Sequence, residues 1–304
     1  MSMHSRAVFQ ALFVTFLWST SWILIKIGLE GIPPLTFGGL RYSLAFLFLL
    51  LFAARQGKVP KLRDQPRSTW IKLIILGLLL YAVTQGAVFL GLYYLQAITL
   101  NLVLSFSAVL VALAGIVLLR ERPSSWQWLG IALSVIGALL FFYPASFSTD
   151  QATGLLIAFI GLSANAVSSI LGRHVNHTLR LDPTMVTLVS MGVGGITLLV
   201  VGTLAQGFPT PTATNWIIVL WLALVNSAFA FTLWNRTLQS LSAMESSVIN
   251  NTMMIQIPIF AWLFLGERPT SQQLLGMALA AAGIILVQLR IGKRTDSEED
   301  RAKN

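Results

Sequence analysis

Long runs of apolar residues recur along the chain, separated by short polar breaks that carry proline or glycine. Most runs reach the roughly 20 residues that a helix needs to cross a hydrocarbon core about 30 Å thick. The pattern therefore predicts an all-α integral membrane protein with ten transmembrane helices. The expected spans are 7–29, 33–54, 70–92, 96–119, 125–143, 154–175, 183–205, 215–238, 242–265 and 271–290.

The composition excludes a water-soluble protein, because 56% of the 304 residues are hydrophobic and only 10% are charged. A typical soluble domain carries about 25% charged residues. Ten spans leave about a hundred residues for all connections, so no soluble domain is expected. The chain contains no G-x-x-x-x-G-K-[ST] phosphate loop. It has no cysteine, which excludes disulfides and thiol chemistry.

The basic residues orient the expected spans in the membrane. An even number of spans puts both termini on one face, and 17 of the 20 Lys and Arg residues then fall on that face. Only Lys26, Arg41 and Arg268 lie toward the other. By the positive-inside rule, both termini are cytoplasmic and the protein is a multi-pass protein of the inner or plasma membrane. The net charge of +9 is thus a topology signal, and nucleic acid is not expected as a partner. Residues 291–304 form a charged cytoplasmic tail that we expect to be disordered.

Two segments of the sequence match each other in register. ERPSSWQWLGIALSVIG at 121–137 and ERPTSQQLLGMALAAAG at 267–283 are identical at ten of 17 positions, at an offset of 146 residues. Capping boxes at the start of each helix explain part of the match, and the shared glycines suit close helix packing. Seventeen residues in register nevertheless predict an internal duplication, with five-helix repeats at 1–146 and 147–290.

Each repeat holds five spans, an odd number, so the second repeat is expected to enter the membrane from the opposite side. Glu121 then lies at the cytoplasmic face and Glu267 at the outer face. Two inverted halves that rock about a shared central site are the arrangement of an alternating-access carrier.

The stretch FLWSTSWILIKIGLEGIPPLTFGGLRYSLAFL (16–47), the two ERP blocks and the ten-span inverted repeat resemble the EamA family of the drug/metabolite transporter superfamily. The similarity covers nearly the whole chain outside the tail. It implies a secondary carrier, often an exporter of amino acids or related metabolites, whose fifth and tenth spans serve in packing or in a homodimer contact. The family often has proline in the fourth and ninth spans. Pro258 fits, but its counterpart is Ala112, so symmetrical proline hinges are not expected.

Polar groups are costly in a bilayer, so they should face protein or a cavity. Aromatic walls with a few amides suit an amphipathic small molecule. Helix–helix hydrogen bonds, or tryptophans that face lipid, are the alternative interpretation. The candidate substrate-binding residues, all expected within spans, are Trp18, Ser21, Trp22, Tyr81, Gln85, Asn101, Ser105, Asn165, Ser169, Ser227, Phe231, Trp234, Ser247 and Asn251.

Three cations lie at or inside the spans. Lys26 and Arg173 end the first and sixth helices, where they either offset a helix dipole or attract carboxylate-bearing cargo to the two mouths. Arg41 is about seven residues into the second span, roughly 10 Å along the helix. It is expected to reach the outer interface or to pair with an acid such as Glu30.

Other chemistry has little support in the sequence. No carboxylate lies at the middle of a span, and Glu245 fits a capping box with Ser242, which favours facilitated diffusion or weakly coupled export over a proton relay. His174 and His177 lack an apparent third ligand, so no metal and no cofactor are expected. No nucleophile–base set converges at membrane depth, which argues against an enzyme. The alternatives left open are a multidrug or other metabolite carrier, a non-transporting membrane enzyme, and a channel or receptor.

Overall fold

A computed structural model describes residues 3–56, 65–119, 124–178, 181–241 and 243–301, and every regular element within them is a helix. Lipid offers backbone groups no hydrogen-bond partner, so apolar runs adopt the structure that satisfies these groups internally. The helices of the first half are α1 (Met3–Gly28), α2 (Pro34–Arg55), α4 (Arg67–Gly77), the π-helical η1 (Leu78–Thr84), α5 (Gln85–Tyr94), α6 (Ala97–Ser105), α7 (Ser107–Leu119) and α8 (Ser125–Phe142). Those of the second half are α9 (Thr149–Thr178), α10 (Pro183–Gln206), α11 (Ala213–Trp221), the π-helical η2 (Leu222–Phe229), α12 (Ala230–Thr237), α13 (Ala243–Asn251), α14 (Met253–Leu265) and α15 (Ser271–Arg301).

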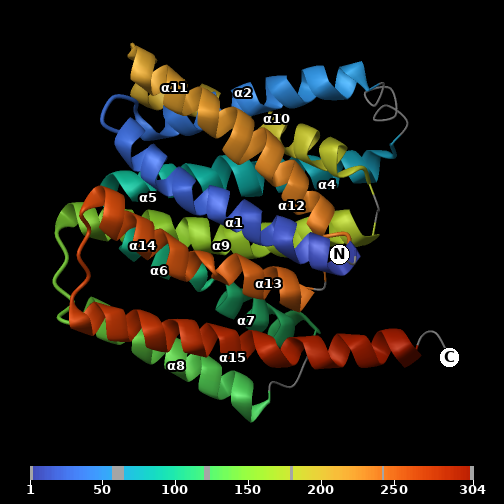
Figure 1. Ribbon diagram of the computed structural model, residues 1–304, viewed down its shortest axis with the longest axis vertical. Coiled ribbons are helices and arrows are strands. Elements are labelled where there is room, and N and C mark those ends of the chain that lie inside the picture. Colours follow the sequence, from blue (N-terminus) through green and yellow to red (C-terminus); the bar gives the residue numbers. More distant parts are fainter. Residues whose placement is uncertain (1–2, 57–64, 120–123, 179–180, 242, 302–304) are drawn as a thin grey trace.

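Nine of the described helical stretches are long and apolar enough to cross a membrane. The fourth expected span contributes a shorter apolar helix, Ala97–Leu113. Figure 1 shows the stretches running side by side, with both chain termini at the same end of the bundle.

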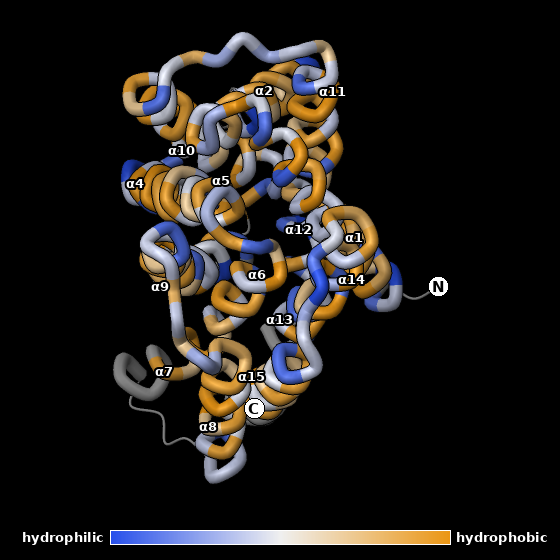
Figure 2. Tube along the Cα trace, turned by 90° about the vertical axis from the view of Figure 1, so that its left-hand side faces the viewer, coloured by the Kyte–Doolittle hydropathy of each residue, from blue (hydrophilic) through white to orange (hydrophobic). Residues whose placement is uncertain are grey.

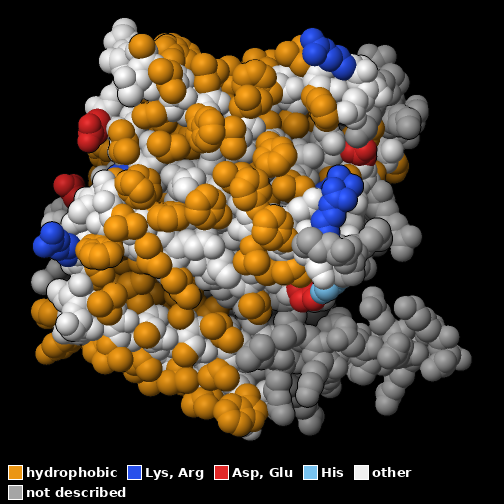
Figure 3. Space-filling model, viewed as in Figure 1, with side chains coloured by type: hydrophobic (Ala, Val, Ile, Leu, Met, Phe, Trp, Pro, Cys, Tyr) orange, Lys and Arg blue, Asp and Glu red, His pale blue; other side chains and the backbone are white. Residues whose placement is uncertain are grey.

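The outer surface of the bundle is apolar. Large hydrophobic side chains such as Leu139, Leu204 and Phe264 are more than 60% exposed. In Figure 3 hydrophobic side chains cover the visible face, and charged ones lie near its two margins, at the helix ends. Figure 2, turned by 90°, shows mainly hydrophobic helices and more hydrophilic connections. This surface suits hydrocarbon between the helix ends and water beyond them.

Local sequence signals set several helix ends. The capping box of Ser124 and Gln127 forms at the start of α8, and Thr270 and Gln273 exchange the same pair of bonds before α15. Gly266, at φ +67°, ends α14 in the left-handed region that glycine adopts without strain. All of these are effects between near neighbours in sequence, which is why a sequence pattern predicts them.

The helix ends in the two halves correspond. α4 and α11, α6 and α13, and α8 and α15 begin 146 residues apart, the offset of the sequence repeat. The fourth and ninth stretches are both broken, at Phe106 and Thr252, again 146 residues apart. The π-helical segments η1 and η2 overlap when one half is shifted onto the other by this offset.

Corresponding helices pack antiparallel. α8 lies against α15 with Gly130 beside Gly283 and Gly137 beside Gly276, so the predicted role of these glycines in close packing is confirmed. α2 and α10 are also antiparallel. Gly202, near the end of α10, meets Thr36 at the start of α2, whereas Gly192, earlier in α10, meets Phe46, later in α2.

The C-terminal segment differs from the expectation. The sequence predicts disorder from residue 291, whereas α15 continues as a helix to Arg301. The membrane span has already formed the costly first turn, so each further residue needs only propagation. The Lys, Arg and Glu residues of this segment are good helix formers.

Candidate functional site

Predicted site residues from both halves meet near the middle of the bundle. Tyr81, on η1, is at the midpoint of the Arg67–Tyr94 stretch, and Ser227, on η2, is ten residues from the end of its stretch, roughly 15 Å along the helix. Trp18 of α1 and Phe231 and Trp234 of α12 lie beside them. We call this group, together with Arg41 and Tyr42 of α2 and Asn226 of η2, the central cluster.

Arg41 is 2% exposed and lies inside this cluster, which corrects the expectation for this residue. Its Nε donates a hydrogen bond of 2.7 Å to Ser227 Oγ, and its Nη2 lies 3.4 Å from the carbonyl oxygen of Asn226. It therefore neither reaches the outer interface nor pairs with Glu30. The physical reason is the packing of α2 against η2, which covers the guanidinium with a neighbouring helix.

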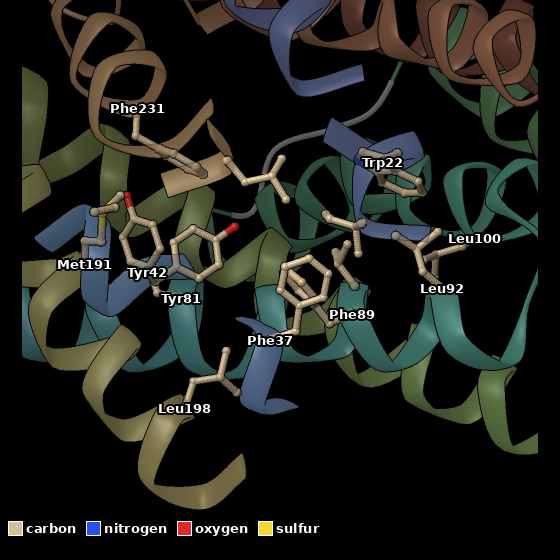
Figure 4. Packing of buried hydrophobic residues seen from close by; sticks show 14 of the residues in the cluster. Trp22, Phe37, Tyr42, Tyr81, Phe89, Leu92, Leu100, Met191, Leu198 and Phe231 are labelled. Carbon is tan, nitrogen blue, oxygen red and sulfur yellow. The ribbon is translucent and has the colours of Figure 1, made fainter. Parts of the chain in front are cut away.

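Aromatic rings line the central cluster. The Trp18 ring centroid lies 4.7 Å from that of Phe231 and 5.2 Å from that of Trp234. Tyr81 lies 5.1 Å from Phe231 and 5.3 Å from Tyr42. The Arg41 guanidinium carbon is 5.0 Å from the centroid of the Tyr42 ring, within cation–π range. Figure 4 shows Tyr42, Tyr81 and Phe231 grouped together.

The π-helical geometry of η2 presents polar groups to this cluster. The backbone carbonyl of Asn226 accepts a hydrogen bond of 3.2 Å from Trp18 Nε1, and Arg41 Nη2 lies 3.4 Å from the same oxygen. The Asn226 side-chain amide donates to the carbonyl of Leu17. Its Oδ1 and the hydroxyl of Tyr42 are buried without a hydrogen-bond partner among the described residues. π-Helical turns are often found at functional sites, and buried polar atoms left unpaired are uncommon.

The other predicted residues of the first, third and sixth spans lie outside this contact network. Ser21 donates to the carbonyl of Trp18 on its own helix, and Trp22 packs near Leu92 and Leu100. Gln85 is half-buried, and the structure gives its amide no hydrogen bond with any described residue. On α9, Asn165 is half-buried and Ser169 is exposed.

The polar residues of the fourth and ninth spans form hydrogen bonds within or between helices. Asn101 donates to the carbonyl of Met253 on α14 at 3.3 Å, and Ser105 donates to the carbonyl of Asn101. Gln288 of α15 donates to Ser247 at 2.6 Å and accepts from Asn251 at 2.9 Å. These contacts agree with the alternative interpretation, in which the polar residues form helix–helix hydrogen bonds and do not line a cavity.

Two charged side chains meet the connection between α5 and α6. Lys26 donates to the carbonyls of Leu92 and Leu95, at 2.5 and 2.8 Å, at the C-terminal end of α5. The carboxylate of Glu267, which is 8% exposed, accepts from the backbone N–H groups of Ala97 and Ile98 at 2.7 and 3.0 Å. A cation at a helix C-terminus and an anion at an N-terminus both complement the helix dipole.

The structure also shows where the remaining charged and histidine side chains of the sequence analysis lie. Arg173 is half-buried near the C-terminal end of α9, and His174 Nε2 lies 3.1 Å from Lys72 Nζ. Within the described residues, no three His, Cys, Asp or Glu side chains are grouped to hold a metal ion. Glu245 Oε1 lies 2.9 Å from His4 Nε2. Its expected capping partner Ser242 and the repeat residue Glu121 lie outside the described residues.

Two hollows open near the connection between α5 and α6. One of about 390 Å³ lies against Tyr94, Gln96 and Phe142, and another of about 520 Å³ lies against Glu30, Pro33 and Tyr93. No residue of the central cluster lines either hollow, so both are distinct from that cluster.

The sequence interpretation missed Tyr42 and Asn226 and misplaced Arg41. A signal existed for Arg41, because an arginine two turns inside an apolar run has few ways to avoid the membrane interior. Nothing in the sequence indicates that Asn226 contacts the carbonyl of Leu17, since the two residues lie on helices far apart in the chain.

Comparisons with known proteins agree with this architecture. The EamA-like transporter family matches residues 5–143 and 152–289, one match for each half. A protein of Escherichia coli (strain K12) named "Uncharacterized inner membrane transporter YedA" is 25% identical, with 93% of this chain and 90% of that protein covered. A "Probable terminal-alkyne amino-acid exporter" of Streptantibioticus cattleyicolor is also 25% identical, with 96% and 97% covered. A solved crystal structure shares the fold, with a TM-score of 0.66 at 18% identity, over 96% of this chain and 99% of that one.

Proposed function

The chain belongs to the EamA-like transporter family, and we propose that it is a secondary carrier that moves small organic solutes by alternating access, with export of amino acids or related metabolites as its task. It is a multi-pass inner-membrane transporter rather than an enzyme. The comparison with the probable amino-acid exporter supports the proposed substrate class.

The proposed architecture is ten spans in two inverted five-helix repeats. Three observations support it: the common offset of the helix ends, the matched breaks at Phe106 and Thr252, and the antiparallel packing of α2 on α10 and of α8 on α15. In an inverted duplication, corresponding helices run in opposite directions across the membrane. With most basic residues at the end that carries the termini, we place that end in the cytoplasm.

The central cluster is the observation that carries the proposal. It joins α1, α2 and η1 of one half to η2 and α12 of the other at mid-depth. It contains a cation, aromatic rings and buried polar atoms that have no hydrogen-bond partner among the described residues. Polar and charged groups at this depth are costly, so their presence usually marks a functional site. A site contacted by both halves can change its access when the halves rock.

The packing of α8 on α15 also bears on oligomeric state. Their glycine faces meet within one chain, whereas Trp126, Trp128 and Leu139 of α8 are exposed. A homodimer, if formed through these helices, would use this outer face.

Reconstitution of the purified chain into liposomes tests the carrier hypothesis. Amino acids and related metabolites loaded inside should drive saturable counterflow of the same labelled solute. Flux that rises linearly without saturation would indicate a channel, and no flux of any solute would favour a receptor. A steep dependence of the flux on an imposed pH gradient, abolished by Glu245→Gln, would contradict facilitated diffusion or weakly coupled export.

A further inference from the structure

The central cluster holds a buried positive charge that the described residues do not neutralise. The acidic side chains whose positions are described are Glu30, Asp150, Asp182, Glu245 and Glu267, and none forms an ion pair with Arg41. The contacts of Arg41 are a hydroxyl, a backbone carbonyl and the Tyr42 ring, all uncharged. An arginine at membrane depth is energetically costly, and such residues usually mark a ligand pathway.

Some N–H donors of the Arg41 guanidinium form no hydrogen bond with any described residue. Nε is engaged by Ser227, the Nη2 contact is long at 3.4 Å, and Nη1 has no hydrogen bond with a described residue. Arginine presents its donors as a planar fork that matches the two oxygens of a carboxylate. The buried, unpartnered hydroxyl of Tyr42, next to Arg41 in sequence, is a further donor.

The surroundings of this fork are apolar rather than acidic. The Phe231 ring contacts both the Tyr81 ring and the Trp18 ring beside it. A ligand with one carboxylate and a flat or apolar body would thus satisfy the charge and bury its remainder. A ligand ammonium group would meet no described carboxylate here, and the positive charge of Arg41 would repel it.

We propose that Arg41 is the anchor of a binding site for amphipathic organic monocarboxylates and that the site disfavours a cationic amine on the same ligand. This inference rests on the proposed carrier function, and it narrows the proposed substrates from amino acids and related metabolites to the related monocarboxylates that carry no ammonium group. The carboxylate binds the guanidinium fork, the Tyr42 hydroxyl donates to it, and the ring cluster encloses the apolar part. The unpartnered Asn226 Oδ1 accepts from a neutral donor of the ligand, such as a hydroxyl or amide N–H.

Three probes that share a 2-phenylethyl unit test the charge preference. 3-Phenylpropionate carries only the carboxylate, phenylalanine carries carboxylate and ammonium, and phenethylamine carries only the ammonium. Thermal unfolding of the full chain in detergent at pH 7 reports binding, because a ligand that prefers the folded state raises its stability. We expect 3-phenylpropionate to reach half-maximal stabilisation at a concentration at least tenfold lower than phenylalanine, and phenethylamine to have no effect. Equal or stronger stabilisation by phenylalanine or by phenethylamine would overturn the inference without any variant.

Variants then identify the anchor. Arg41→Gln should abolish stabilisation by 3-phenylpropionate, and Arg41→Lys, which keeps the charge but loses the fork, should weaken it about tenfold. Arg236→Gln is the matched control, because Arg236 is an exposed arginine on α12, and it should bind as wild type does. Wild-type binding by a folded Arg41→Gln chain would refute the assignment.

Counterflow in liposomes separates this inference from the carrier hypothesis. Saturable exchange of another solute, without stabilisation by 3-phenylpropionate, would refute the monocarboxylate site and leave the carrier function intact. Arg41-dependent binding without exchange of any solute would support the site and contradict the carrier function.

Discussion

Gly130 of α8 and Gly283 of α15 meet so closely that a Cβ atom added to Gly130 would lie 2.7 Å from the carbonyl oxygen of Gly283. The reciprocal pair, Gly137 and Gly276, shows the same approach. The repeat offset maps one pair onto the other, as expected for two helices related by a twofold axis. In a bilayer, where lipid is as apolar as a leucine side chain, such close backbone packing is a main source of helix association.

Gly130→Ala should therefore destabilise the protein. Its Cβ would contact backbone atoms that cannot rotate away, so α8 must shift from α15, at a cost of about 1–3 kcal/mol. Thermal unfolding in detergent measures the effect. Gly172→Ala is the control, because its Cβ would have only an ordinary contact of 3.6 Å with Leu76, and it should unfold at the wild-type temperature or above. Equal unfolding temperatures for the two variants would contradict the packing argument.

The hydrogen bond from the Asn251 amide to Gln288 Oε1 predicts a structural role for Asn251. In a double-mutant cycle, Asn251→Ala and Gln288→Ala should show a coupling of about 0.6 kcal/mol, and at most about 1.7 kcal/mol, the range of interhelical hydrogen bonds in membranes. The half-saturation concentration of the transported solute should stay unchanged in Asn251→Ala. Ser163→Ala serves as a control, because Ser163 is exposed and its hydroxyl bonds only within α9. A weaker apparent affinity at unchanged stability would favour the cavity role instead.

These examples show which features the sequence could predict. Helix positions follow from run lengths and local caps such as Ser124 with Gln127, so most expected boundaries agree with the structure within a few residues. The exceptions are the end of α15, at Arg301 instead of 290, and the fourth span, whose apolar helix is shorter than expected. That Tyr81 and Phe231 lie at a similar depth follows from the repeat offset, which relates Tyr81 to Ser227 and Gln85 to Phe231. The partner of Arg41 does not, because a contact between α2 and η2 depends on how two helices rotate against each other, which the apolar pattern does not determine.

Glu267 is predicted to stabilise the start of α6. Glu267→Gln keeps one acceptor oxygen but places an amide N–H₂ opposite a backbone donor and removes a charge that complements the helix dipole. We expect a loss of about 1 kcal/mol in unfolding free energy. Glu30→Gln makes the same chemical change at an exposed position near that end of the bundle and should leave the unfolding temperature unchanged. Identical unfolding curves for both variants would show that the hydrogen bonds of Glu267 to the start of α6 contribute nothing to stability.

Lys26 is predicted to act on stability rather than on affinity. Lys26→Gln weakens the bonds to the carbonyls of Leu92 and Leu95 and removes a charge from the C-terminal end of α5, at a cost of about 0.3–1 kcal/mol. The half-saturation concentration for a carboxylate-bearing solute should stay within twofold of wild type in a liposome assay. A large rise in the half-saturation concentration for anionic solutes alone would support the other hypothesis, in which Lys26 attracts carboxylate-bearing cargo at the outer mouth.

The inversion of the two repeats can be tested directly, because the chain has no cysteine to give background labelling. α2 and α10 are the second helices of their repeats, and Arg55 at the end of α2 and Thr210 just beyond α10 are both exposed. Antiparallel packing of these helices puts the two positions at opposite ends of the bundle. In intact cells, Thr210→Cys should react with a membrane-impermeant maleimide, whereas Arg55→Cys should react only after permeabilisation. Reaction of both from the same side would exclude the inverted arrangement, and reversed accessibility would place the termini outside the cell, against the positive-inside assignment.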